Sequence, residues 1–377
     1  MKKIAIITNV IPTYRRTFYD CLLANPDIAI RIFCWSTIKG MNLSLCHQEF
    51  PDHVHVVEGW SLPREQLAWQ RLSFLGMLRE FDGFVFYGNP RVLSNVFYSL
   101  ACRMLGRKVG IWGQAHTAGS SGLTEWLRLR WWSLFDNLFV YTNREVDYLR
   151  EKGVQARNLM GMNNGLDQRT IDGVAERFDA TTLAAWRADQ QVPDVPILLS
   201  CARLEPKNCF DILVEALVLL AARGLDFHWV VIGEGAEGVA LRRRVAEHGL
   251  EDRVSWLGAI YDEEALAPWF LSASVMVHPA AIGLSLLHAF GYGLPVITHD
   301  NAEAQMPEFA AMEDGHTGLL YREGSIESLA EVIANALSNF ERLPAMGERC
   351  RTIAREDYNV DEMARRFSLF AERMLDA

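Results

Sequence analysis

The chain has 377 residues, of which 50% are hydrophobic and 22% are charged, and its formal net charge is −10. A chain of this length can form two domains that each bury a core, and this composition excludes an intrinsically disordered protein. No apolar run approaches the roughly 18 residues of a membrane-spanning helix. The seven cysteines show no C-x-x-C and no other metal-ligand spacing, which is typical of a protein in a reducing cytosol.

The charge is unevenly distributed along the chain. Residues 1–170 contain 20 Lys and Arg against 14 Asp and Glu, whereas residues 171–377 contain 17 against 33. Because the first half is basic, we expect it to meet an anionic partner, such as a membrane surface or a phosphorylated acceptor. The chain has no dense Lys/Arg stripe and no nucleic-acid-binding motif, so nucleic acid is not an expected partner.

Short β-type runs alternate with helix-period segments, which is typical of parallel sheets covered by helices. The first run is interrupted by Asn9 and Pro12, so we interpret it as a buried strand and not as a secretory signal. We expect strands at 4–8, 28–35, 54–57, 84–87, 109–112 and 138–141, and, after a restart, at 197–201, 229–232, 254–257, 275–277, 296–298 and 318–321.

These elements predict an α/β protein with two doubly wound Rossmann-like domains facing a cleft. The first would span residues 1–170, with a C-terminal helix over about 358–377 packing back on it. The second would span residues 171–357. The polar, proline-edged segment 168–196 is predicted to hold the linker and an entry helix. In such sheets ligands bind beyond the carboxyl ends of the strands, so the loops there are the candidate sites.

The strand at 197–201 leads into a loop that carries Arg203 and Lys207, and an apolar-faced helix begins near Phe210. Two cations beside a helix N-terminus, with its partial positive charge and unbonded N–H groups, are suited to a polyanion. The alternative is that both are solvated loop charges.

Residues 233–238 read G-E-G-A-E-G and match the dinucleotide motif G-x-G-x-x-G. The motif follows the second strand of its domain, however, and the next strand ends at Gly258 without an acid to hold a ribose hydroxyl. We therefore predict no nicotinamide or flavin cofactor, and expect a tight glycine turn near the phosphates or sugar of a ligand.

A second dense stretch spans residues 278–295. A strand ends near Pro279, Gly283 permits a close backbone approach, and an apolar helix begins near Leu284. Its N-terminal N–H groups would form a second anion site. The alternative is a plain strand–helix–strand crossover.

Together these segments resemble the family 4 glycosyltransferases, which have the GT-B fold. The similar segments are A-R-L with Lys207, G-E-G at 233–235, W-L-G at 256–258, G-Y-G-L-P-V-I at 291–297, P-E at 307–308 and D-G-H-T-G-L-L at 314–320. Residues 164–167, N-G-L-D, resemble the turn that closes the first domain of that family.

The resemblance implies a retaining, metal-independent glycosyltransferase that needs no cofactor beyond a nucleotide-diphosphate sugar as donor. It implies that Arg203 and Lys207 stabilise the departing diphosphate and that His116 reaches the donor sugar. The residues implied to bind the donor are Gly233, Gly235, Gly258, Ile260, Gly283, Leu284, Ser285, His288, Tyr14 and Arg15.

One departure from the family concerns two glutamates that it usually carries eight positions apart, the second contacting the nucleotide ribose. Here the second position is His288, and the first falls on Ala280 or Ala281. We expect His288 to contact the ligand; the alternative is a buried helix residue.

In the first domain, residues 126–135 place aromatic and basic side chains in one predicted helix. This helix either faces the core or contacts a membrane surface.

The expected function is the transfer of a UDP- or GDP-type sugar to a saccharide or polyprenyl-diphosphate-linked acceptor in bacterial surface polysaccharide synthesis. The expected location is the cytoplasm, with peripheral contact to the inner face of the plasma membrane. The alternatives are a nucleotide-sugar epimerase of the same fold and a non-catalytic nucleotide-binding relative.

Overall fold

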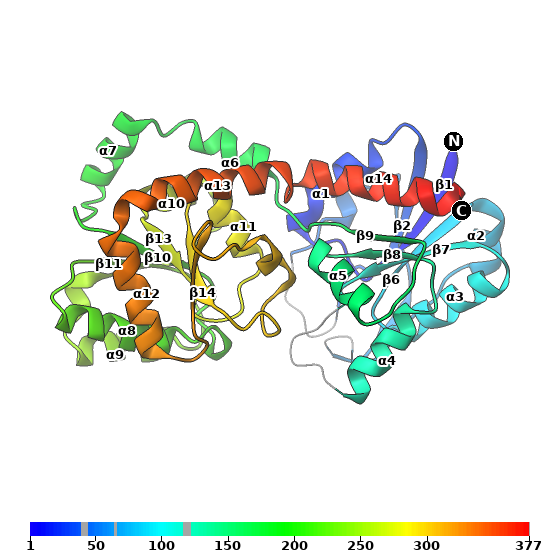
Figure 1. Cartoon of the computed structure of the whole chain (residues 1–377). Coiled ribbons are helices and arrows are strands. Elements are labelled where there is room, and N and C mark those ends of the chain that lie inside the picture. The colour runs from blue at the N-terminus through cyan, green and yellow to red at the C-terminus, as the bar shows by residue number, and fades with distance from the viewer. Residues whose placement is uncertain (39–43, 64–65, 116–121, 377) are drawn as a thin grey trace. The chain divides into compact units, whose positions relative to one another are not determined.

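The computed structural model describes residues 1–38, 44–63, 66–115 and 122–376 (Figure 1). His116 lies outside these described residues. The chain divides into two compact units: unit 1 consists of residues 1–164 and 359–377, and unit 2 consists of residues 165–358. Each unit is built around its own parallel sheet, which confirms the predicted fold class.

The sheet of unit 1 has seven parallel strands in the order β3-β2-β1-β6-β7-β8-β9. The direction in which successive strands are added reverses between β1 and β6, so this sheet has a topological switch point there. The strands are β1 Lys2–Ile7, β2 Ile28–Cys34, β3 Val54–Val56, β6 Gly83–Tyr87, β7 Lys108–Gly113, β8 Asn137–Val140 and β9 Asn158–Gly161.

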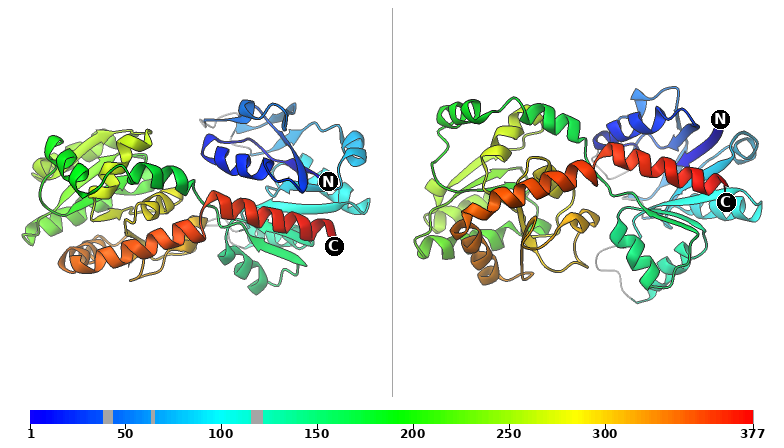
Figure 2. Two further views of the ribbon diagram at one scale, coloured as in Figure 1. Left: turned by 90° about the horizontal axis from the view of Figure 1, so that it is seen from above. Right: turned by 45° about the horizontal axis from the view of Figure 1, so that its top comes forward.

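Helices cover this sheet, and the last one comes from the C-terminus of the chain. They are α1 Arg16–Leu23, α2 Phe74–Glu80, α3 Leu93–Met104, α4 Leu123–Trp132, α5 Asn143–Glu151 and α14 Val360–Asp376. Figure 2 shows α14 beside α1. The apolar side chains of α14 belong to the same core cluster as those of the sheet. The ring of Phe367 lies 5.9 Å from that of Trp112 and 5.6 Å from that of Phe139.

The sequence patterns missed three short strands of unit 1. Strand β9 is four residues long and begins with a buried asparagine, so it carries little apolar signal. A two-stranded antiparallel hairpin, β4 Gly59–Ser61 with β5 Ala68–Gln70, has three residues per strand. Runs this short cannot be distinguished from loops by periodicity.

The sheet of unit 2 has six parallel strands in the order β12-β11-β10-β13-β14-β15. Strand β10 pairs with β11 on one side and with β13 on the other, so the switch point of this unit lies between β10 and β13. The strands are β10 Ile197–Cys201, β11 His228–Ile232, β12 Val254–Gly258, β13 Val275–Val277, β14 Val296–His299 and β15 Gly318–Tyr321.

The segment expected to hold the linker contains two helices of unit 2. Helix α6 spans Gln168–Ala175 and buries Ile171 and Val174. Helix α7 spans Ala180–Asp189 and places Trp186 with its ring 4.8 Å from that of Trp269. The remaining helices are α8 Phe210–Ala222, α9 Gly238–Glu247, α10 Glu263–Ser272, α11 Leu284–Gly291, α12 Ile326–Ser338 and α13 Leu343–Glu356.

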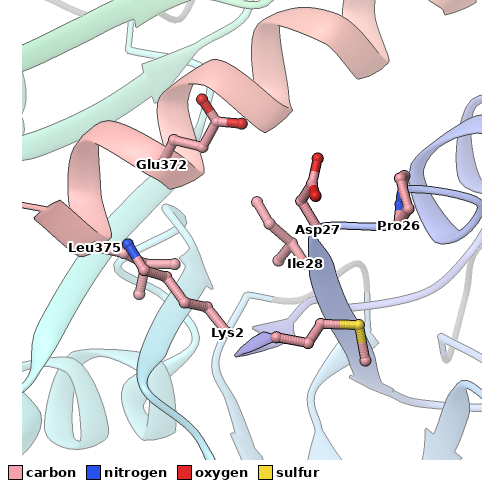
Figure 3. A pocket seen from close by; sticks show the side chains of 7 residues that line it. Lys2, Pro26, Asp27, Ile28, Glu372 and Leu375 are labelled. Atoms are coloured by element: carbon pink, nitrogen blue, oxygen red, sulfur yellow. The ribbon is translucent and has the colours of Figure 1, made fainter.

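A cavity of about 450 Å³ lies at the end of unit 1 where β1 and β2 begin. Figure 3 shows Lys2, Asp27 and Ile28 on the strand side of this cavity and Glu372 and Leu375 on α14. It lies at the amino ends of the strands, opposite the edge where ligands bind in doubly wound sheets. We therefore assign it no part in the candidate site.

A buried carboxylate ties together the carboxyl ends of β7 and β8. Glu145 is 5% exposed, and its two oxygens accept hydrogen bonds from the backbone N–H of Ala115 at 2.7 Å and of Tyr141 at 2.8 Å. Thr142 caps the same helix by accepting from the N–H of Glu145. Glu145 thereby holds together the chain segments that directly follow β7 and β8 at the carboxyl edge of the sheet.

We predict that Glu145→Gln lowers the free energy of unfolding by about 1–3 kcal/mol, because one buried N–H would face an amide NH₂ in place of a carboxylate oxygen. Urea unfolding measures the loss. The control is Glu151→Gln, an exposed residue at the end of the same helix. Equal stability of the two variants would contradict this role.

Candidate functional site

The loops that follow β10, β11, β12 and β13 meet at the carboxyl edge of the sheet in unit 2, around its switch point. Arg203 and Lys207 follow β10, Gly233 and Gly235 follow β11, and Gly283 follows β13. The fold therefore gathers at one edge residues that lie 80 positions apart in the sequence.

Backbone contacts to the glycine loop hold the loop that carries Arg203. The N–H of Leu204 donates to the carbonyl of Glu234 at 2.9 Å, and the N–H of Glu237 donates to the carbonyl of Leu204 at 2.8 Å. A Cβ atom on Gly235 would lie 2.3 Å from the Leu204 oxygen. The glycines are thus required by packing between the two loops, and a ligand contact is not needed to explain them.

Arg203 and Lys207 are both exposed, whereas Leu204, which lies between them in the sequence, is buried. Neither forms an ion pair with any residue that the structure describes. Lys207 lies in a short 3₁₀ turn, Pro206–Asn208, just before α8, and the side chain of Asn208 donates to the carbonyl of Arg203 at 2.6 Å. Two cations on a braced loop, without counter-ions, are suited to bind a phosphate group.

The loop before α11 is pinned by buried polar side chains that the sequence patterns did not reveal. Gln305 accepts a hydrogen bond from the N–H of Ile282 at 2.8 Å, and Thr298 donates to the carbonyl of Ala280 at 3.1 Å. The hydroxyl of Tyr321 donates to the carbonyl of Pro279. These contacts fix Gly283 as the N-cap of α11, so that the N–H groups of Leu284 and Ser285 lie in the first turn, where N–H groups have no intrahelical acceptor.

His288 lies one turn further along α11 and is part of a cluster with Glu263 and Tyr292. One oxygen of Glu263 is 2.7 Å from Nε2 of His288 and 2.6 Å from the hydroxyl of Tyr292. The His288 ring also packs against Phe270, with centroids 4.6 Å apart. Burial raises the pKa of Glu263, but the hydrogen bonds from His288 and Tyr292 outweigh this, and the pKa is lowered below its ordinary value.

His278, at the end of β13, stays neutral because it is buried. Burial lowers its pKa to about 4, and its ring lies 6.0 Å from that of Phe210. Burial also lowers the pKa of His299, at the end of β14. Neither ring adds positive charge to this edge at neutral pH, whereas Arg203 and Lys207 in the loop after β10 do.

Unit 1 has its own polar pocket at the carboxyl edge of its sheet, with a volume of about 180 Å³. It is lined by Thr8 after β1, Tyr87 in β6, Trp112 in β7 and Tyr141 after β8, and therefore spans the switch point of this unit. Of the two residues expected to bind the donor from this unit, Tyr14 is half-exposed and Arg15 is buried, and both line the pocket.

The predicted aromatic helix of the first domain is α4, which begins at Leu123 and ends at Trp132, so the expected bounds were about three residues too late. Its side chains divide into two sets. Trp131 and Trp132 are buried in the core, whereas Trp126 and Leu127 are exposed, and the guanidinium of Arg130 lies 5.3 Å over the Trp126 ring.

No helix in the described part of the chain is long and apolar enough to cross a membrane. The same residues contain no group of three His, Cys, Asp or Glu side chains arranged to hold a metal ion.

Comparisons with known proteins agree with this architecture. Residues 195–339 match the model of the glycosyl transferases group 1 family. The chain is 26% identical over 210 residues to the GDP-mannose-dependent α-(1-6)-phosphatidylinositol monomannoside mannosyltransferase of Mycobacterium tuberculosis, a match that covers 53% of each chain. It is 32% identical over 178 residues to the D-inositol 3-phosphate glycosyltransferase of Streptomyces coelicolor, covering 44% of this chain and 38% of the relative. The chain thus spans about half the length, or less, of these curated relatives.

Among solved structures, the complex of HepE from Anabaena with UDP superposes with a TM-score of 0.72 at 14% identity, covering 99% of this chain and 100% of that one. The family model matches only residues of unit 2, whereas this structural likeness covers both units. Residues 195–339 thus match the group 1 glycosyl transferases, and the chain as a whole has the GT-B fold of the solved HepE structure.

Proposed function

We propose that this protein transfers a sugar, with retention of anomeric configuration, from a UDP- or GDP-type nucleotide sugar to a saccharide or polyprenyl-diphosphate-linked acceptor. The reaction would serve bacterial surface polysaccharide synthesis at the cytoplasmic face of the membrane. Unit 2 would bind the donor and unit 1 the acceptor. One observation supports this above the others: two exposed cations, which pair with no carboxylate of the described residues, follow β10 at the switch point of unit 2, and β10 pairs with β13, the strand that leads into α11.

In this proposal Arg203 and Lys207 act on the leaving group. The bond from the anomeric carbon to the diphosphate breaks in the transition state, and negative charge grows on the diphosphate oxygens. Cations already held in place stabilise this charge more than they stabilise the bound donor, which is the condition for lowering a barrier. The N–H groups of Leu284 and Ser285 would contribute to the same end. We propose that no metal ion is required, because these groups supply the positive charge.

The cluster around His288 gives the donor site a carboxylate. We propose that Glu263 takes the place of the missing family glutamate, with one oxygen held by His288 and Tyr292 and the other offered to a ribose hydroxyl. The lowered pKa of Glu263 supports this role, because an ionised carboxylate can only accept hydrogen bonds. His288 would then contribute to donor binding through Glu263.

We predict that Arg203→Ala and Lys207→Ala each lower kcat/KM by a factor of roughly 30 to 1,000, the equivalent of about 2–4 kcal/mol of transition-state stabilisation. The folded state should remain intact, because both side chains are exposed. Turnover of a panel of UDP and GDP sugars and thermal unfolding test the two statements.

Arg243→Ala is the matched control, since Arg243 is an exposed cation of unit 2 on α9. Wild-type turnover in both Arg203→Ala and Lys207→Ala would contradict the assignment. The same assay in excess chelator tests whether a metal ion is required. Loss of activity in chelator, with recovery on addition of Mg²⁺ or Mn²⁺, would contradict metal independence.

A second prediction concerns pH and His288. Because the pKa of Glu263 is lowered in the folded state, its ionisation stabilises the fold above the ordinary carboxyl pKa, and this contribution is lost as the pH falls through the lowered value. His288→Ala should therefore cost about 1.5–3 kcal/mol at pH 7 and less at an acidic pH at which the carboxylate is protonated. It should also weaken binding of UDP or GDP at pH 7.

Urea unfolding at the two pH values and nucleotide titration give both readouts. His248→Ala is the control, because His248 faces Glu215 at 3.7 Å in a more exposed pair, and such pairs contribute little. A stability loss in His288→Ala with unchanged nucleotide affinity would show that the cluster serves packing alone.

A third prediction concerns the exposed side of α4, which we propose as the membrane contact. Trp126 and Leu127 would enter the lipid interface while Arg130 meets anionic headgroups. Binding to vesicles that contain anionic lipid should fall with added salt, with Arg130→Glu, and with the double change Trp126→Ser and Leu127→Ser. Vesicle sedimentation measures it.

The control here is Phe340→Ser, which removes an exposed aromatic residue of unit 2. Absence of vesicle binding at every salt concentration, together with full activity on a soluble oligosaccharide, would contradict the membrane contact.

A further inference from the structure

Arg15 carries a buried positive charge without a negative partner. The side chain is 9% exposed, and no carboxylate of a described residue forms an ion pair with it. Its contacts are the amide oxygen of Asn164, at 3.3 Å from Nη2, a hydrogen bond with Tyr141, and the faces of neighbouring rings. Removing a guanidinium from water costs several kcal/mol, and neutral partners offset only part of that cost.

The rings around Arg15 come from three different segments of unit 1. The guanidinium carbon lies 5.3 Å from the ring centroid of Tyr141, 5.5 Å from that of Trp112 and 5.8 Å from that of Tyr14. Burial lowers the pKa of Arg15, but the phenol groups of Tyr141, Tyr14 and Tyr19 outweigh this and raise it, so the charge is retained. Aromatic faces stabilise a cation while leaving its N–H groups available to a ligand.

Two residues that line this pocket each carry a buried N–H group that has no acceptor among the described residues. Nε of Arg15 and Nε1 of Trp112 are both inaccessible to solvent and lack a hydrogen-bond partner among the described residues. Both residues line the pocket of about 180 Å³ at the switch point of unit 1. Buried donors are usually paired in folded proteins, and the unpaired Nε of Arg15 adds to the cost of its buried, uncompensated charge, which an anion in the pocket would reduce.

From this geometry we infer that the Arg15 pocket binds an anionic group carried by a sugar, either a carboxylate or a phosphate, as part of the acceptor. The statement that this sugar is an acceptor rests on the proposed transferase function. The binding of its anionic group to the pocket does not. The planar guanidinium matches both groups with paired hydrogen bonds. Tyr14 and Tyr87, which also line the pocket, are only partly buried and can contact a sugar, and the volume of about 180 Å³ suits a single sugar ring.

The donor diphosphate is the alternative occupant, and charge placement argues against it. Unit 2 already holds two exposed cations for the diphosphate, at its own switch point. The Arg15 pocket is built entirely from residues of unit 1. A buried, singly charged, aromatic-lined site also suits the single charge of a uronic acid better than the multiple charges of a diphosphate.

The test titrates the full chain with three sugars that differ in charge: glucuronate, glucose 1-phosphate and glucose. Calorimetry gives the affinities. The NMR signal of the Trp112 indole N–H reports binding at the pocket, and this signal is assigned by its loss in Trp112→Phe. Glucuronate, glucose 1-phosphate or both should bind and shift this signal, and glucose should bind at least about tenfold more weakly. The comparison of glucuronate with glucose 1-phosphate distinguishes a carboxylate site from a phosphate site.

Arg15→Met should abolish the preference for the charged sugars. It should leave the thermal midpoint unchanged or raised, because an apolar residue of similar length removes an unpaired buried charge. Arg16→Met is the matched control, because Arg16 is the next residue and is exposed and paired with Glu49. This variant should change neither the affinity for the charged sugars nor the shift of the Trp112 signal. Trp112→Phe, which keeps a ring and loses the N–H, should weaken binding of the charged sugar if Arg15→Met fails to fold.

Equal affinity of wild type and Arg15→Met for the charged sugars would overturn the inference, as would equal affinity for charged and neutral sugars. UDP and GDP affinity unchanged in Arg15→Met supports the acceptor over the donor, and a loss of nucleotide affinity overturns it. If the chain binds glucuronate through Arg15 but transfers no sugar from any nucleotide donor, the pocket stands and the proposed transferase function falls.

Discussion

The close approach of two backbone segments at the edge of unit 2 determines where its charges stand. The carbonyl oxygens of Ala202 and Leu204 occupy the space that side chains at Gly233 and Gly235 would need. Hydrogen bonds in both directions then lock the two loops together. Leu204 anchors the loop inward, which leaves Arg203 and Lys207 directed outward. A flexible loop would lose entropy on binding a polyanion, whereas this loop has already been ordered by folding.

The two cationic sites proposed to bind anions lie in physically different environments. Arg203 and Lys207 are hydrated, so they bear no desolvation cost in the unliganded protein and their attraction for a ligand is screened. Arg15 is buried among rings, where electrostatic interactions are stronger and an unpaired charge is costly. A site of the second kind discriminates strongly between charged and neutral ligands, because only a charged one compensates the buried guanidinium.

The sequence predicted the fold well because both units are built from repeated strand–helix units, whose apolar runs are long enough to recognise. It located the cation loop for the same reason: Arg203 and Lys207 follow an unambiguous strand. It missed β9 and the β4–β5 hairpin, which are three or four residues long. It also missed Glu145 and Glu263, because an acidic residue in the first turn of a helix is expected on the surface, and only the tertiary fold brings it to buried donors.

The Glu263 cluster illustrates why a missing residue is not the same as a missing chemical group. A position-by-position comparison finds a histidine at 288 where a carboxylate is expected, and it cannot show whether another residue supplies the carboxylate. In the folded chain that histidine is 2.7 Å from a carboxylate 25 residues earlier, and Tyr292 donates to the same oxygen. Two donors on one oxygen hold the ionised form in a partly buried place, where burial alone would favour the neutral acid. In the proposed donor site, the carboxylate would therefore come from α10 and not from α11.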